Sequence, residues 1–147
     1  MKEFEIRPHR GFGPVLLGMH RDEVRSVLGR PTHVQEAHEK WGIQFPDRDD
    51  FFDSALQVRY DSDLRVEFIE AAPSAHFSAT YQALDVHRTG AERVLKHVEK
   101  DAQPDRDDPE FPCNPIFPAL DLTVYRGSED DPIRAIGLGI PGYTRQS

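Results

Sequence analysis

The apolar residues of the first half alternate with polar ones in two neighbouring segments. Leu56, Val58 and Tyr60 alternate before a turn at residues 61–63, and Val66 and Phe68 alternate after it. A period of two is typical of strands with one buried face. The same pattern flanks residues 127–132, where the alternating residues are Leu120, Leu122, Val124, Ile136, Leu138 and Ile140. We therefore predict two antiparallel hairpins, with further strands over residues 4–6, 41–45 and 77–81.

Two shorter segments have the spacing of amphipathic helices. In the first, Val24, Val27 and Leu28 form one stripe, and Gly29 and Pro31 end the helix. In the second, residues 89–92 have the pattern of a capping box. The apolar face of this second helix is predicted to contain Ala91, Val94, Leu95 and Val98.

The chain contains an internal similarity at an offset of 67 residues. Residues 17–28 then lie over residues 84–95, and five of these twelve positions are identical. In each half the helix is followed by a polar or proline-rich connection and then by a hairpin. A repeated order of elements is typical of a duplicated unit. The matched apolar residues Val27, Leu28, Val94 and Leu95 are expected to be buried.

These patterns predict an α+β fold in one globular domain, residues 1–147. The domain is expected to be a tandem duplication of a helix-plus-antiparallel-sheet unit, with repeats of about 13–72 and 76–143. Strands with one polar face suit an antiparallel sheet that helices cover on one side only. We therefore expect both helices to pack on the same face of the sheet. The five prolines within residues 99–119 predict a long loop there.

The segment over residues 13–31, with its Gly18-Met19, Val24, Leu28-Gly29 and Pro31, resembles the opening of the small outer-membrane assembly lipoproteins of the SmpA/OmlA type. The two-copy layout resembles the β-lactamase-inhibitor-protein-like (BLIP-like) fold. The resemblance implies a non-catalytic scaffold that presents a sheet surface and loops to a protein partner. The lipoproteins carry a lipidated cysteine and the inhibitors carry disulfides, whereas Cys113 is the only cysteine here. Neither a membrane role nor β-lactamase inhibition is therefore implied.

The charge balance narrows the classes of partner. The chain has 26 acidic and 18 basic residues, and its net charge is −8. This field repels phosphate backbones and anionic lipid surfaces, so we expect neither a nucleic-acid nor a membrane partner. The single cysteine and the charged N-terminal segment predict a cytoplasmic protein.

The sequence contains no nucleophile elbow, P-loop, zinc-protease motif or dinucleotide fingerprint. We therefore expect that the protein is not an enzyme and binds no cofactor. His33 and His38 are five residues apart, a spacing that does not place both on one helical face. His20 and His87 precede the two helices at matched positions, which favours a shared role at helix entry. Cys113 lies in a constrained Phe-Pro-Cys-Asn-Pro segment and is interpreted as structural.

Acidic residues are concentrated in three segments that we expect to be loops. Residues 47–53 have a net charge of −3, residues 99–110 of −4 and residues 129–131 of −3. Aromatic residues adjoin these segments, and aromatics ringed by acids suit the recognition of a basic protein. The candidate partner-binding residues are Asp49, Asp50, Phe51, Phe52, Asp53, Asp105, Asp107, Asp108, Phe111, Glu129, Asp130 and Asp131.

The leading hypothesis from the sequence is a non-enzymatic protein-binding module, of an immunity or inhibitor type, that recognises a basic protein. The alternative is a small-ligand or metal-binding domain that uses the groove between the two repeats, with His33, His38 and the acids of residues 47–53 as ligands. A third hypothesis is a hydrolase built around Cys113 and a histidine. The sequence indicates no oligomeric state.

Overall fold

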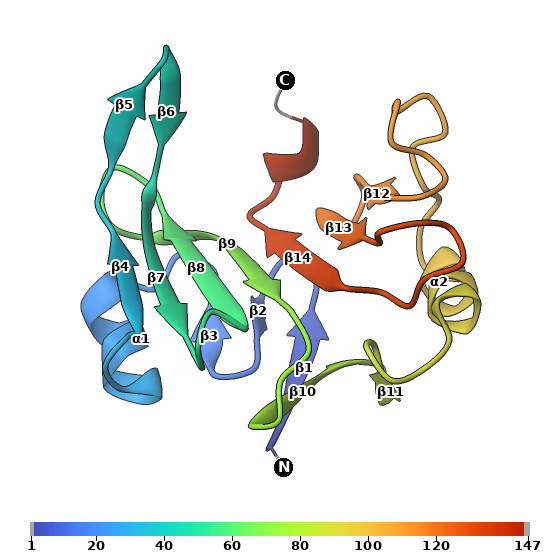
Figure 1. The fold of residues 1–147 in the computed structure, drawn as a ribbon, viewed down its shortest axis with the longest axis horizontal. Helices are drawn as coiled ribbons and strands as arrows, with labels where there is room; N and C mark the ends of the chain where they lie inside the picture. Colours follow the sequence, from blue (N-terminus) through green and yellow to red (C-terminus); the bar gives the residue numbers. More distant parts are fainter. Residues whose placement is uncertain (1, 146–147) are drawn as a thin grey trace.

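Strands, most of them antiparallel, form most of the regular secondary structure, and two helices accompany them, so the fold is mixed α+β (Figure 1). The computed structural model describes residues 2–145. Seven strands form the larger sheet, in the spatial order β12-β13-β14-β9-β8-β7-β4, and every neighbouring pair in it is antiparallel. Their bounds are β4 His33–Gln35, β7 Asp47–Phe51, β8 Leu56–Tyr60, β9 Val66–Ala71, β12 Ile116–Phe117, β13 Leu122–Tyr125 and β14 Ala135–Gly139.

A second sheet has five strands in the order β11-β10-β1-β2-β3. These are β1 Lys2–Arg7, β2 Gly11–Phe12, β3 Val15–Leu16, β10 Phe77–Tyr81 and β11 Leu84–Asp85. Strands β1 and β10 are parallel, which joins the start of the chain to its middle. A separate hairpin of β5 His38–Lys40 and β6 Ile43–Phe45 projects away from both sheets (Figure 1). The short 3-10 helix η1, Tyr143–Arg145, follows β14.

The predicted hairpins are confirmed. Strands β8 and β9 flank the turn at residues 61–63, and β13 and β14 flank the turn before residue 135. Their inward residues, which include Leu56, Val58, Leu122 and Leu138, are fully buried in one core cluster. The strands expected over residues 4–6 and 77–81 are also present. Of the strand expected over 41–45, only residues 43–45 form one, because residues 41 and 42 make a turn.

Helix α1, Arg21–Leu28, presents a different face from the predicted one. Val24 is fully buried and Leu28 is half-buried, but Val27 is 51 % exposed. The expectation that Val27 is buried is therefore wrong. The reason is Arg25, which turns toward the sheet to contact Asp49, so the buried face is centred on residues 24, 25 and 28.

Helix α2, Ala91–Glu99, buries Ala91, Val94 and Val98, whereas Leu95 is half-buried. The two helices begin at Arg21 and Ala91, so their starts are 70 residues apart rather than 67. Val24 thus corresponds to Val94 in its place on the helix. The predicted capping box at residues 89–92 is absent: Gly90 is the N-cap and forms no side-chain cap.

Truncation of these valines tests the corrected helix faces. Val24→Ala or Val94→Ala is expected to lower the free energy of unfolding by about 2 kcal/mol, because two buried methyl groups and their packing are lost. Val27→Ala is expected to change it by less than about 0.5 kcal/mol. Urea unfolding followed by circular dichroism measures all three. Equal losses for Val27→Ala and Val24→Ala would contradict this orientation of α1.

Two further expectations concern loops and helices. The expectation that the acidic segment 47–53 is a loop is wrong for residues 47–51, which form strand β7 next to the edge strand β4, and only residues 52 and 53 lie in a turn. Residues 101–115 contain neither a helix nor a strand, which confirms most of the predicted proline-rich loop.

Within the described part of the chain, neither helix has the length and apolar character needed to cross a membrane.

Candidate binding surface

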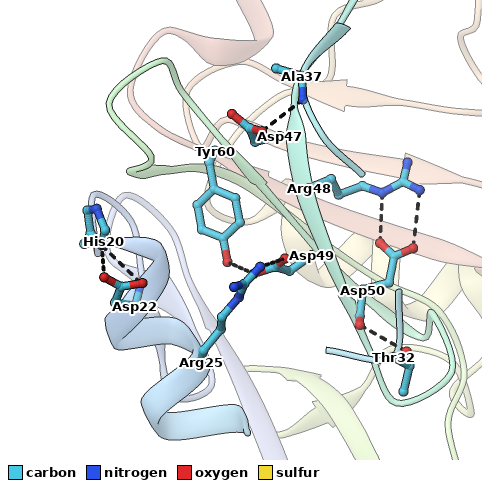
Figure 2. Close-up of polar contacts among 10 residues, drawn as sticks. All are labelled: His20, Asp22, Arg25, Thr32, Ala37, Asp47, Arg48, Asp49, Asp50 and Tyr60. Carbon is cyan, nitrogen blue, oxygen red and sulfur yellow. Dashed lines mark hydrogen bonds and ion pairs between the residues drawn. The ribbon is translucent and has the colours of Figure 1, made fainter. Parts of the chain in front are cut away.

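The projecting hairpin is fastened at its base to the larger sheet. Pairing between β4 and β7 ends at Gln35 and Arg48, and pairing between β5 and β6 begins beyond them. The Gln35 side-chain amide donates to the carbonyl of Pro46 at 2.8 Å. The backbone N–H of Ala37 donates to Asp47 Oδ1 at 2.9 Å (Figure 2). These two bonds hold both strands of the hairpin at the place where it leaves the sheet.

The tip of this hairpin presents a tryptophan to solvent. Trp41 and Gly42 form a two-residue turn in which both have positive φ, 54° and 76°, as a type I′ turn requires. Glycine accepts this conformation freely, but a bulky residue at the first position is strained. The Trp41 side chain is 83 % exposed, and the neighbouring Ile43 is 55 % exposed. The hairpin therefore displays apolar surface without any packing gain to its own fold.

The faces of the hairpin contain two further contacts of aromatic rings. The His38 ring stacks on Phe45 with a centroid separation of 4.8 Å and an interplanar angle of 9°. The Lys40 ammonium lies 4.4 Å from the centroid of the Trp41 ring. The stacked pair stiffens the hairpin, and the lysine places a positive charge beside the exposed indole.

A groove of about 670 Å³ lies at the base of the hairpin. Phe45 and Asp47 line it from the hairpin side, and Asp61, Glu67 and Tyr143 line it from the body. Burial raises the pKa of Glu67, and the nearby charge of Asp61 raises it further. The hairpin thus stands beside a groove that contains the carboxylates of Asp47, Asp61 and Glu67 and the guanidinium of Arg59, whose charge opposes the rise in the pKa of Glu67.

Asp49 is buried on β7 and holds α1 against the sheet. Its carboxylate accepts from Arg25 Nε at 2.9 Å and from Arg25 Nη2 at 2.7 Å, and Tyr60 donates its hydroxyl to it at 2.9 Å (Figure 2). The hydrogen bond with Asp49 raises the pKa of Arg25. Burial raises the pKa of Tyr60, and the charge of Asp49 adds to this effect.

Asp50 is engaged on the other side of the same strand. Arg48 donates to its two carboxylate oxygens at 2.8 and 3.3 Å, and Thr32 donates its hydroxyl to the Asp50 carbonyl at 3.0 Å (Figure 2). Asp49, Asp50 and Phe51 are at most 2 % exposed. These three candidate residues therefore have internal partners and offer no surface to another molecule.

Of the candidate residues 49–53, only those in the turn after β7 reach the surface. Asp53 is exposed at positive φ, whereas Phe52 is half-buried. The Phe52 ring packs edge-on against Phe4 at 6.0 Å and tilted against Phe77 at 5.3 Å. Phe52 thus belongs mainly to the packing between the N-terminal strand and β10.

The structure brings the other two acidic segments together. Glu99, Phe111 and Glu129 line one groove of about 310 Å³ between α2 and the proline-rich loop. Arg126 fastens that loop by donating to the carbonyls of Pro112, Cys113 and Glu129 at 2.7 to 3.1 Å. Among the candidate acids of these two segments, Asp105, Asp107, Glu129 and Asp130 are exposed, while Asp108 and Asp131 are half-buried. This group lies toward the β12 end of the larger sheet and Asp53 toward the β4 end.

His20 and His87, which precede the two helices, make different contacts. His20 caps α1, because the Asp22 N–H donates to His20 Nδ1 at 3.1 Å and the His20 N–H donates to Glu23 at 3.3 Å. His87 does not cap α2; its Nδ1 lies 2.9 Å from the Ile133 carbonyl. The expected shared role of these two histidines is therefore wrong.

The histidines considered as metal ligands lie on different strands, and the cysteine has its own contact. His33 lies on β4 and His38 on β5. No group of three or more His, Cys, Asp or Glu side chains within residues 2–145 could hold a metal ion. Cys113 directs its thiol to the Arg126 carbonyl at 3.7 Å.

The environment of His87 predicts a dependence of stability on pH. Burial lowers the pKa of His87 in the folded state below 6.5, although its contact with the Ile133 carbonyl opposes this. Below about pH 6.5 the unfolded chain binds a proton that the folded chain does not, so stability falls as the pH falls. His87→Asn is expected to reduce this slope between pH 7.5 and 5.5 in urea unfolding. His33→Asn, on an exposed residue, is the control, and an unchanged slope in His87→Asn would contradict the prediction.

No protein-family model, curated protein or solved structure matches this chain.

Proposed function

We propose that the chain is a non-enzymatic protein-binding module whose β5–β6 hairpin inserts Trp41 into an apolar pocket of a basic protein partner. The observation that carries this proposal is the 83 % exposure of Trp41 at the strained tip of a projecting hairpin. Tryptophan is enriched among the residues that dominate binding energy at interfaces. The strained backbone of Trp41 gives the fold no packing contact in return, which suggests that this residue has a function in binding.

Charge supports a basic partner. The net charge of −8 attracts positively charged proteins at long range and increases the rate of encounter. The exposed acids Asp53, Asp105, Asp107, Glu129 and Asp130 are the candidates for this steering. The groove at the base of the hairpin contains three carboxylates and one guanidinium, a balance that favours a cation of the partner. An immunity- or inhibitor-type protein that acts on a basic enzyme in the cytoplasm is the form of this function that we favour.

We also infer a tandem duplication with both helices on one face of the larger sheet. Helix α1 precedes the consecutive strands β7, β8 and β9, and α2 precedes β12, β13 and β14. Each trio forms an antiparallel meander, and the two meanders meet where β9 pairs with β14. This symmetric order supports one ancestral unit that was copied and joined at its last strand.

A photo-crosslinking residue placed at position 41 tests the proposed function in the source cell. We expect it to capture one basic protein that the same residue at position 125 does not capture. With that protein purified, Trp41→Ala should weaken binding about 30-fold or more, equivalent to about 2 kcal/mol. Tyr125→Ala is the matched control, because Tyr125 is also exposed, at 52 %, but lies on β13. Equal affinities of Trp41→Ala and the unmodified protein would contradict the proposal.

A further inference from the structure

The groove between α2 and the proline-rich loop, here called the α2 groove, combines an apolar lining with a charged rim. Its volume is about 310 Å³. Leu95 and Phe111 are half-buried, so part of the apolar lining is still open to solvent. Apolar recesses within a polar rim receive anchoring side chains at protein interfaces. The apolar residues that line the groove are Leu95, Pro104, Phe111, Pro112, Pro115 and Phe117.

The loop wall of the α2 groove is held in place by the protein itself. Arg126 is 7 % exposed, and its guanidinium donates to three backbone carbonyls of the segments that border the groove. The Asp105 N–H donates to the Ile116 carbonyl at 2.9 Å. The Val124 N–H donates to the Pro115 carbonyl at 3.0 Å. A ligand that enters a groove already formed pays less conformational entropy on binding.

The charges around the α2 groove favour a basic ligand. Lys96 is already paired with Glu92 at 3.1 Å, and within residues 2–145 no cation pairs with Glu129. Pro104 and Phe111 both line the groove, and the six residues between them contain four acids and one arginine, a net charge of −3. The lining itself has three carboxylates and two cations, a net charge of −1, from Glu92, Glu99, Glu129, Lys96 and Arg126.

We propose that the α2 groove binds a short protein segment in which one apolar side chain is flanked by lysine or arginine residues. The apolar side chain enters between Leu95 and Phe111, and the flanking cations lie against Glu99 and Glu129. Complementary charge increases the rate of encounter and disfavours acidic segments. The site goes beyond the proposed function, because Phe117 places it at the β12 end of the larger sheet and the β5–β6 hairpin follows β4 at the other end. It is a second docking surface that does not use Trp41.

Three synthetic peptides test this proposal on the full chain. The first has one leucine between two pairs of lysines, the second has serine in place of the leucine, and the third has glutamates in place of the lysines. In NMR titrations, we expect the first peptide to shift the amide signals of Leu95, Phe111 and Phe117 in a saturable way. The serine peptide should bind about tenfold or more weakly, because the apolar contact is lost. The glutamate peptide should leave these three signals unchanged.

Variants of the rim separate local from general attraction. Glu99→Gln combined with Glu129→Gln should weaken binding of the first peptide about fivefold or more. Glu5→Gln combined with Glu36→Gln is the matched control, because both residues are exposed carboxylates outside the groove and the change in net charge is the same. This control should change the affinity less than about twofold, since distant charges are screened. Trp41→Ala should bind the peptide as the unmodified chain does.

The proposal is overturned if the signals of Leu95, Phe111 and Phe117 do not respond to the first peptide. It is also overturned if the serine or the glutamate peptide binds as tightly, or if the rim and control pairs weaken binding alike. Shifts of the same signals with protein concentration alone would identify a second copy of the chain as the occupant, and would overturn it as well.

Discussion

Replacing Asp49 with asparagine is expected to lower the free energy of unfolding by about 3 kcal/mol. The carboxylate is fully buried and accepts three hydrogen bonds, two from Arg25 and one from Tyr60. Its loss leaves the buried Tyr60 hydroxyl with a neutral partner and removes the ion pair that ties α1 to β7. Removal of one member of a buried ion pair is among the most destabilising single changes.

Tyr60→Phe and the double variant Asp49→Asn/Tyr60→Phe complete a thermodynamic cycle for this network. Tyr60→Phe alone should lower stability by about 1–2 kcal/mol, because it removes one bond to a charged acceptor. The double variant should lose less than the sum of the single variants, since the two groups share one bond. Urea unfolding measures each free energy. A loss below about 1 kcal/mol for Asp49→Asn would show that this network adds little to stability.

Replacing Asp121 with asparagine is expected to release the C-terminal segment from the larger sheet. The Asp121 carboxylate accepts from the backbone N–H groups of Gly142 and Thr144 at 3.0 and 3.1 Å and from the Thr144 hydroxyl at 2.8 Å. His9 Nε2 lies 3.2 Å from it. Burial raises the pKa of Asp121, but these hydrogen bonds outweigh that effect and lower it overall. The carboxylate thus joins both ends of the chain to the turn before β13.

Asparagine tolerates the positive φ of 50° at this position, so the change removes the charge without added backbone strain. We expect a loss of about 2 kcal/mol and faster hydrogen exchange at the amides of Gly142 and Thr144. Because the folded pKa is lowered, the stabilisation should be present near neutral pH and decline as the pH falls below about 4. Asp130→Asn, at an exposed site, should change neither quantity. Unaltered exchange at Gly142 in Asp121→Asn would contradict this role.

Strands could be predicted from the sequence where alternating apolar residues mark the buried face. Leu56, Val58 and Tyr60 are buried on β8, whereas the residues between them are half-buried. Strand β7 could not be found in this way, because its inward residue Asp49 is charged. Its burial depends on Arg25, 24 residues earlier, and a pairing at that distance is invisible to local periodicity. The same arginine explains why the orientation of α1 was mispredicted at Val27.

The candidate surface was predictable only in part. The acidic segments beside Phe111 and Glu129 do converge on one groove, but Asp49 and Asp50 are internal. Trp41 lies at the start of the strand predicted over residues 41–45, and it is one of the aromatic residues that adjoin the acidic segments. The available signal was Gly42 between strand-forming residues, since glycine accepts the positive φ of a two-residue turn, although tryptophan is not a residue that such turns favour at the first position. Exposure of Trp41 itself depends on the projection of the hairpin, which is a property of the tertiary fold.

The position of Trp41 also determines what optical spectroscopy can report on this protein. It is the only tryptophan in the chain, and its indole is already surrounded by water in the folded state. Unfolding will therefore change its fluorescence little, and circular dichroism is the suitable signal for the denaturation experiments. Burial of the same ring by a partner would shift its emission to shorter wavelength. The unmodified chain thus carries an intrinsic fluorescent reporter that is nearly silent to unfolding and sensitive to docking at the hairpin tip.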